Sequence, residues 1–119
     1  MKLPKPLPET VRLFETLVAD DPRLEVRKLF GQPCAFANGN MCLGVLGADI
    51  FLRLSEADRL SARNIPGTRP FEPIVGRPLS EYLVFPLDVL RESTQSRLWV
   101  KRCLTYALGL PPKRPKRRR

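Results

Sequence analysis

The chain has 119 residues, a length that fits one domain able to bury a core without disulfide or metal staples. Its 43% hydrophobic and 8% aromatic residues exclude a wholly disordered chain. No run approaches the roughly 20 apolar residues that a membrane-spanning helix needs. The net charge of +9, from 21 basic and 12 acidic residues, favours contact with an anionic partner over binding of a cation.

Histidine is absent, which removes the commonest general base and the commonest metal ligand. There are three cysteines, Cys34, Cys42 and Cys103. A low and odd count argues against a disulfide framework. Prolines occupy the amino terminus where a signal peptide needs an apolar run, so we expect a cytoplasmic protein. We predict no enzyme, no metal site and no cofactor.

The amino-terminal part is predicted to be an extended arm followed by a helix. Residues 1–7 are punctuated by prolines, and Pro8 suits the first turn of a helix, where its missing N–H costs nothing. Apolar residues then recur at helical spacing, at Val11, Phe14, Leu17 and Val18. Asp20-Asp21-Pro22 should end this helix.

Residues 26–54 are predicted to form three strands. The candidate strand segments are a short run at 26–30, the two hairpin arms at 34–37 and 41–46, and an alternating segment at 50–54. Asn38-Gly39-Asn40 is a strong hairpin signal because Asn and Gly accept positive φ at little cost. In the last run, apolar residues alternate around Arg53, which is typical of a half-buried strand with one arginine pointing outward.

The next segment is predicted to be a helix followed by a loop. Ser55 should cap the helix, Leu60 and Ile65 should face inward, and Pro66-Gly67 should end it. Residues 66–80 contain four prolines and are loop-like, with Ile74-Val75 as a candidate short edge strand. Residues 81–85 are a clearer strand, and residues 87–91 a single helical turn.

The last helix is predicted over residues 93–108, with Gly109 as its cap and prolines after it. One apolar stripe contains Trp99, Cys103, Tyr106 and Leu110, so we assign Trp99 and Tyr106 to the core and not to base stacking. The predicted fold is α+β with two layers, in the order α-β-β-β-α-β-β-α. Its sheet should be antiparallel, with the helices packed on one face.

Six of the last seven residues are basic: Lys113, Arg114, Lys116, Arg117, Arg118 and Arg119. We predict one folded domain over residues 1–112 and a disordered basic tail over residues 113–119. The domain alone has 15 basic and 12 acidic residues, a net charge of +3, so most of the excess belongs to the basic tail. These six residues are candidate nucleic-acid-binding residues, because neutralising phosphates releases counterions without reading sequence. The alternative is a solvated tail that only aids solubility.

Other candidate sites have simpler interpretations. Arg97, Lys101 and Arg102 could extend the basic surface toward the tail, but an ordinary solvated helix face is favoured, as it is for Arg12, Arg23, Arg27 and Lys28. If residues 38–40 form a three-residue loop, Cys34 lies diagonal to Cys42 on one sheet face. Small buried hydrophobes are the favoured role for both cysteines, with Cys103 on a distant element.

Several segments together carry a family resemblance: Val26-Arg27-Lys28-Leu29-Phe30-Gly31, Asn38-Gly39-Asn40-Met41, Ile50-Phe51-Leu52-Arg53-Leu54-Ser55, Gly76-Arg77-Pro78-Leu79 and Glu81-Tyr82-Leu83-Val84-Phe85-Pro86. Their order and spacing resemble the N-terminal domain of the TfoX/Sxy family, bacterial proteins linked to regulation of natural competence. The resemblance spans roughly residues 9–110. Gln32-Pro33 departs from it, because a second glycine is common there in the family.

The resemblance implies a secretion-chaperone-like α+β fold and suggests a regulatory role. Longer members carry a second, C-terminal domain, which we expect this chain to lack, so competence regulation is not carried over. We therefore predict a non-enzymatic protein with weak, sequence-nonspecific nucleic-acid or polyanion binding through the basic tail. The alternative is a protein-interaction or dimerisation module, because an exposed sheet edge can accept a partner strand.

Overall fold

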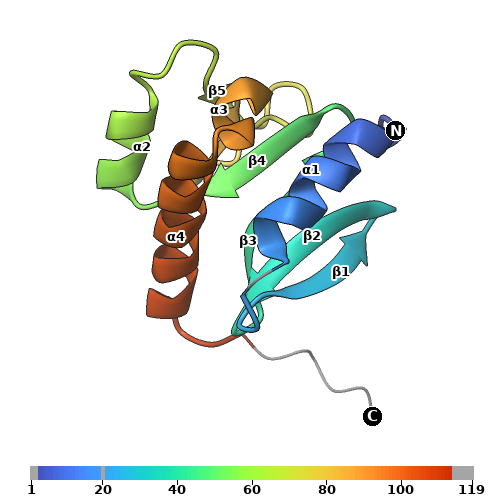
Figure 1. Cartoon of the computed structure of the whole chain (residues 1–119). Coiled ribbons are helices and arrows are strands. Elements are labelled where there is room, and N and C mark those ends of the chain that lie inside the picture. Colours follow the sequence, from blue (N-terminus) through green and yellow to red (C-terminus); the bar gives the residue numbers. More distant parts are fainter. Residues whose placement is uncertain (1–2, 20, 114–119) are drawn as a thin grey trace.

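The computed structural model describes residues 3–19 and 21–113. The elements of these residues are α1 (Pro8–Val18), β1 (Glu25–Leu29), β2 (Gln32–Ala37), β3 (Asn40–Leu46), β4 (Asp49–Arg53), α2 (Glu56–Ala62), β5 (Arg69–Pro70), β6 (Tyr82–Phe85), α3 (Leu87–Arg91) and α4 (Ser93–Gly109) (Figure 1). The predicted α+β class and the order of helices and strands are confirmed. Four strands precede α2 where three were predicted, because each of the four candidate segments pairs with the next.

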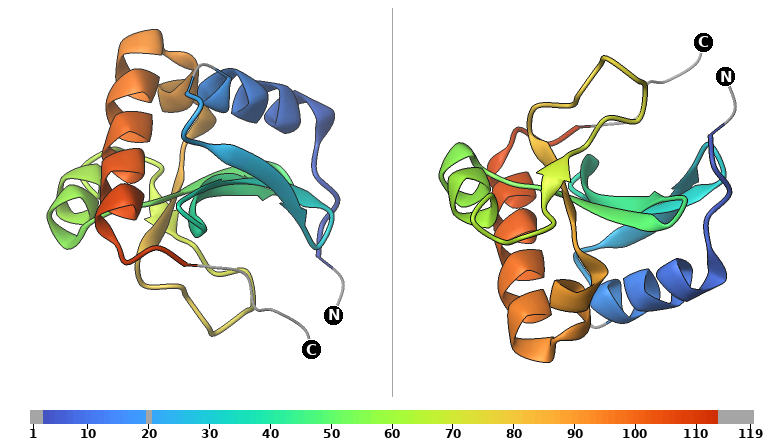
Figure 2. Two further views of the ribbon diagram at one scale, coloured as in Figure 1. Left: turned by 90° about the horizontal axis from the view of Figure 1, so that it is seen from below. Right: turned by 90° about the horizontal axis from the view of Figure 1, so that it is seen from above.

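The strands form one antiparallel sheet in the order β1-β2-β3-β4-β6-β5. Both α1 and α4 pack on the same face of this sheet, as predicted, and contact its central strands β3 and β4 (Figures 1 and 2). The main core lies between the two layers. Its largest fully buried side chains include Phe14, Leu43, Ile50, Leu52 and Phe85. None of the helices in the described part of the chain has the length and apolar character needed to cross a membrane.

The opposite, outer face of the sheet has a smaller apolar cluster of Cys34, Phe51, Phe71 and Val84. Phe71 belongs to the loop between β5 and β6, which lies on the other side of the sheet from α1 (Figure 2). Its ring stacks on that of Phe51 with centroids 4.0 Å apart. The proline-rich loop therefore covers the outer face near β4 and β6, while the outer face of β1 remains uncovered.

The predicted edge strand at Ile74-Val75 is wrong. Ile74 makes only an isolated bridge to Arg77, and Val75 is 91% exposed. The edge strand is instead β5, a two-residue segment that pairs with β6. The anchor of this loop is the aromatic stack of Phe71, which a search for alternating apolar residues does not detect.

A two-residue turn joins β2 and β3, because Asn38 and Gly39 both have positive φ. The pairing continues from Phe36↔Met41 to Ala35↔Leu43, with a β-bulge that leaves Cys42 as the extra residue. The bulge puts Cys42 in the main core together with Leu43, whereas Cys34 lies in the outer cluster. The prediction that Cys34 and Cys42 share a sheet face is therefore wrong, but their burial is confirmed.

Among the helices, the predicted cap of α2 is confirmed, because the Ser55 hydroxyl accepts a hydrogen bond from the Asp58 N–H at 3.2 Å. Leu60 was predicted to face inward but is 59% exposed, since α2 buries Ala62 instead. Trp99 and Cys103 lie in the core on α4, as predicted, and Tyr106 is half-buried. Gly109 ends α4 without the positive φ of a glycine cap.

Packing between the two central strands depends on Gly44. A Cβ at this position would lie 2.7 Å from both Cys34 Sγ and Phe51 Cζ. We expect Gly44→Ala to lower the free energy of unfolding by about 1–3 kcal/mol through overpacking, measured by urea denaturation. Gly109→Ala is the control, because nothing lies within 4 Å of its Cβ and it should be neutral or stabilising. Equal effects of the two substitutions would contradict this account.

Candidate functional site

The chain after α4 returns to the β2–β3 turn and is fixed there by two hydrogen bonds. The Lys113 N–H donates to the Asn38 carbonyl at 2.8 Å, and the Asn40 side-chain amide donates to the Pro111 carbonyl at 3.0 Å. Gly39 lies directly beneath, so close that a Cβ there would overlap the Lys113 carbonyl oxygen. The first residue of the basic tail is therefore anchored on the sheet.

Lys113 lies at a concavity of about 670 Å³ on the outer face of the sheet. Five strands contribute to its lining, which consists of Glu25, Arg27, Leu29, Phe36, Gly39, Asn40, Met41, Arg53, Tyr82 and Lys113. Its volume is in the range of known ligand pockets. This outer-face concavity thus brings Arg27 and Arg53 to the point where the basic tail begins.

Arg53 is the most constrained cation of the outer-face concavity, with 19% of its side chain exposed. Its Nε donates to Glu81 Oε1 at 2.7 Å, and its guanidinium carbon lies 5.4 Å from the centroid of the Tyr82 ring. Burial opposes the charge, but the bond to Glu81 and the neighbouring tyrosines outweigh it and raise the pKa of Arg53. The prediction of a half-buried strand is wrong, because Phe51 is buried on the outer face and Ile50 and Leu52 are buried on the inner face. Arg53 does lie on the outer face, and its guanidinium remains a fixed positive charge.

Arg27 and Phe36 form the second feature of the outer-face concavity. The Arg27 guanidinium carbon lies 3.9 Å from the centroid of the Phe36 ring, and its Nε is 3.4 Å from Glu25. A guanidinium stacked on an aromatic ring is held over the face of that ring. From the sequence, Arg27 was predicted to be an ordinary solvated residue. The stacking was missed because Phe36 lies nine positions away, on the neighbouring strand.

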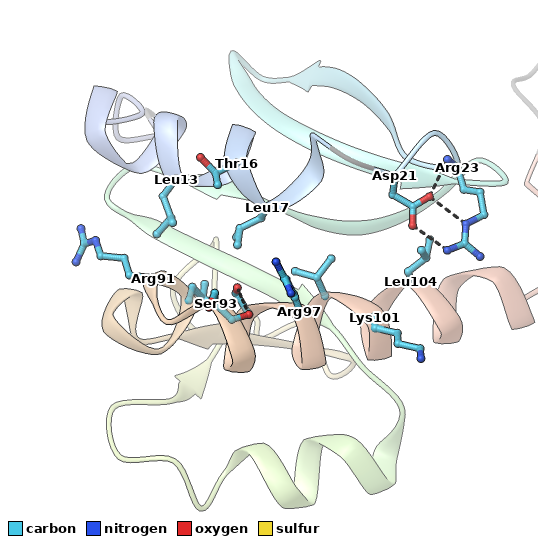
Figure 3. A pocket seen from close by; sticks show the side chains of 13 residues that line it. Leu13, Thr16, Leu17, Asp21, Arg23, Arg91, Ser93, Arg97, Lys101 and Leu104 are labelled. Carbon is cyan, nitrogen blue, oxygen red and sulfur yellow. Dashed lines mark hydrogen bonds and ion pairs between the residues drawn. The ribbon is translucent and has the colours of Figure 1, made fainter.

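A second groove, of about 500 Å³, lies on the helical side between α1 and the α3–α4 region (Figure 3). Leu13, Leu17 and Leu104 contribute apolar walls, and Arg97 and Lys101 contribute charge. Asp21 at one end accepts hydrogen bonds from Arg23, which lower the pKa of the Asp21 carboxyl to about 2.

The basic residues of α4 do not share a concave surface with Lys113, the one tail residue that the structure describes. Arg97 and Lys101 line the helical groove, not the concavity that contains Lys113. Arg102 is directed toward Asp58, at 3.7 Å, and stacks over the Trp99 ring at 4.9 Å. Of the predicted nucleic-acid-binding residues, Lys113 lies at the outer-face concavity. The other five, Arg114, Lys116, Arg117, Arg118 and Arg119, lie outside the residues that the structure describes.

The buried cysteines occupy two separate places. The prediction that Cys103 lies on an element distant from the other cysteines is wrong for Cys42, because the two meet in the core. Burial and then the hydrogen bond with Cys42 raise the pKa of the Cys103 thiol. Cys34 lies alone in the outer cluster, and burial raises the pKa of its thiol to about 11. Across residues 3–19 and 21–113, no group of three or more His, Cys, Asp or Glu side chains is placed to hold a metal ion.

Anchoring of the basic tail can be tested at Gly39. Gly39→Ala should destabilise the fold by about 1 kcal/mol from its φ of +79°, with a further loss as Lys113 is displaced. Gly31→Ala is a matched control, because Gly31 has a φ of +78° with nothing within 4 Å of its Cβ. In the full chain, urea denaturation should show a larger loss of unfolding free energy for Gly39→Ala than for Gly31→Ala. After removal of residues 113–119, the two substitutions should cost the same. A difference that persists after the truncation would rule out the contact with Lys113.

Two raised pKa values predict loss of stability at high pH. Burial raises the pKa of Cys34 to about 11 and of Tyr82 to about 12, so the unfolded chain loses these protons first as the pH passes about 9. The contribution of these two protonated groups to the free energy of unfolding is complete below pH 9 and disappears as the pH approaches 11 to 12. The free energy of unfolding then falls by at most about 1.4 kcal/mol per pH unit for each group. Urea denaturation from pH 8 to 10.5 should show a shallower decline for Cys34→Ala and Tyr82→Phe than for the wild type. Parallel declines would show that neither group is responsible.

A family model, the TfoX N-terminal domain, matches residues 16–107 of the chain. The match covers most of the described residues, from α1 to the last turn of α4, so the chain belongs to the TfoX N-terminal domain family. It ends before Lys113 and does not include the basic tail. No curated protein and no solved structure matches the chain.

Proposed function

We propose that this member of the TfoX N-terminal domain family is a non-enzymatic regulatory protein that binds nucleic acid or another polyanion weakly and without sequence preference. The contacts come from the basic tail, with Arg27 and Arg53 beside its starting point. The observation that carries the proposal is the anchoring of Lys113 at the outer-face concavity. Lys113 is the first of six basic residues among the last seven of the sequence, so this charged run begins at a defined place on the sheet.

Electrostatics divides the work between the basic tail and the sheet. Glu81 pairs with Arg53 and Glu25 lies beside Arg27, so these two arginines add little net charge to the outer-face concavity. A paired guanidinium still directs its remaining N–H groups toward phosphate oxygens, while the tail supplies the unbalanced charge. The basic tail therefore sets the affinity, and the sheet sets where the polyanion lies.

Aromatic side chains in the outer-face concavity favour a single strand over a duplex. Tyr82 and the Arg27–Phe36 stack present flat surfaces, on which an unpaired base can stack without regard to its identity. Bases inside a duplex are not available for this contact. The proposal therefore includes tighter binding to a flexible single strand than to a duplex of the same length.

Removal of the basic tail tests the proposal. Six neutralised phosphates predict that the logarithm of the duplex association constant falls with log salt at a slope of about −5, and at about −4 for a single strand. Fluorescence anisotropy with labelled 20-nucleotide strands should show this slope for the full chain. Deletion of residues 113–119, or glutamine at all six basic positions, should abolish most of the affinity and the slope.

The control variant carries glutamine at three exposed arginines outside the outer-face concavity, Arg12, Arg63 and Arg77. It loses charge without touching the proposed surface and should retain nearly all of the affinity. The Arg27→Gln substitution should weaken single-strand binding more than duplex binding. Absence of binding at low salt, or equal binding by the full and truncated chains, would refute the proposal.

A further inference from the structure

One edge of the sheet is open. β1 is its outermost strand, and all five residues of β1 are exposed, including Val26 at 50% and Leu29 at 39%. Within the described part of the chain, the backbone of β1 has hydrogen-bond partners only on β2. An edge of this kind presents unpaired N–H and C=O groups to a further strand.

The register identifies which backbone groups point outward. Phe30 and Gly31 have positive φ and form a two-residue turn, so Leu29 and Gln32 are a hydrogen-bonded pair. Such pairs alternate along an antiparallel ladder, which leaves the N–H and C=O groups of Val26 and Lys28 facing away from β2. Pro33, opposite Lys28, agrees with this assignment because proline has no N–H to donate.

We propose that the occupant of this edge is a second copy of the chain, paired antiparallel through β1 and centred on Val26. Opposite residues of an antiparallel pair lie on the same face of the sheet. A two-fold axis perpendicular to the sheet therefore pairs one residue of β1 with its own copy. The central residue of the pairing can be Val26, Arg27 or Lys28, because a centre at either end of β1 would leave only one residue of the strand paired.

Charge decides between these three registers. Centring on Val26 places Glu25 opposite Arg27 of the second copy, and this ion pair occurs twice by symmetry. Centring on Arg27 or on Lys28 instead places two like charges directly opposite each other, which is destabilising. The Val26 register is therefore the one in which the strand is complementary to itself.

In the paired form the two sheets join edge to edge with their outer faces on the same side. Both outer-face concavities include β1 residues, so they lie next to the junction, and each has its own Lys113. Two basic tails on one surface would bind a long polyanion with higher avidity than one. The pairing itself needs no polyanion, so it stands or fails independently of the proposed function.

Cysteine substitution tests the register. In the Val26 register the two Cα atoms at position 26 are about 5.5 Å apart, within disulfide range, whereas those at position 28 are offset by about 13 Å along the strands. Val26→Cys should form a cross-linked dimer under mild oxidation, and the matched variant Lys28→Cys should not. Because the native cysteines are all buried, they should not compete.

Sedimentation of the full chain without nucleic acid tests the association itself. Glu25→Arg and Arg27→Glu should each weaken the dimer at least fivefold, and the double variant should recover it because the pair is restored in reverse. Val26→Pro should give a monomer with an unchanged circular dichroism spectrum, since its lost N–H faces outward. A monomer at concentrations up to about 1 mM, equal cross-linking at positions 26 and 28, or no recovery in the double variant would each overturn the proposal.

Discussion

The turn at Asn38 and Gly39, with the bulge that follows at Cys42, determines how the rest of the structure is arranged. Positive φ at both turn residues fixes the β2–β3 register. That register directs Cys42 and Leu43 into the main core and leaves Phe36 and Met41 on the outer face. The missing side chain of Gly39 also makes room for Lys113. This one turn therefore determines which side chains lie on each face of the sheet, and it also holds Lys113, the first residue of the basic tail.

Charge is distributed between a balanced domain and an unbalanced end of the chain. Most carboxylates near the outer face pair with arginines, as in Arg53–Glu81 and Arg69–Asp49, both at 2.7 Å. The more exposed of these two pairs, Arg69–Asp49, adds little stability, but both pairs reduce the long-range field of the domain. The sequence of the basic tail, by contrast, contains six basic residues and no acidic one. In the proposed function, the tail therefore supplies the long-range attraction for a polyanion, and the surface beside Lys113 supplies the short-range contacts.

Local patterns predicted the fold well where a single element decides the outcome. The spacing of Phe14 and Val18, the cap at Ser55 and the hairpin at Gly39 are all confirmed. The predictions for Leu60 and for Ile74-Val75 failed because tertiary contacts determine them: α2 buries a small alanine, and an aromatic stack holds the proline-rich loop. Only part of the candidate site could be predicted from the sequence. The basic tail is contiguous in sequence, whereas Arg27 and Arg53 line the same concavity as Lys113 from separate strands.

The two edges of the sheet differ in a way that limits association. β5 is two residues long and contains Pro70, which lacks the N–H that a further strand needs. β1 is longer, but like charges oppose the registers centred on Arg27 and on Lys28, whereas the register centred on Val26 has none directly opposite. The proposed pairing through β1 would occupy the open edge of each copy and leave only β5 at both ends. The proposed association would therefore stop at two chains, because the charges that oppose other registers of β1 also favour the self-complementary one.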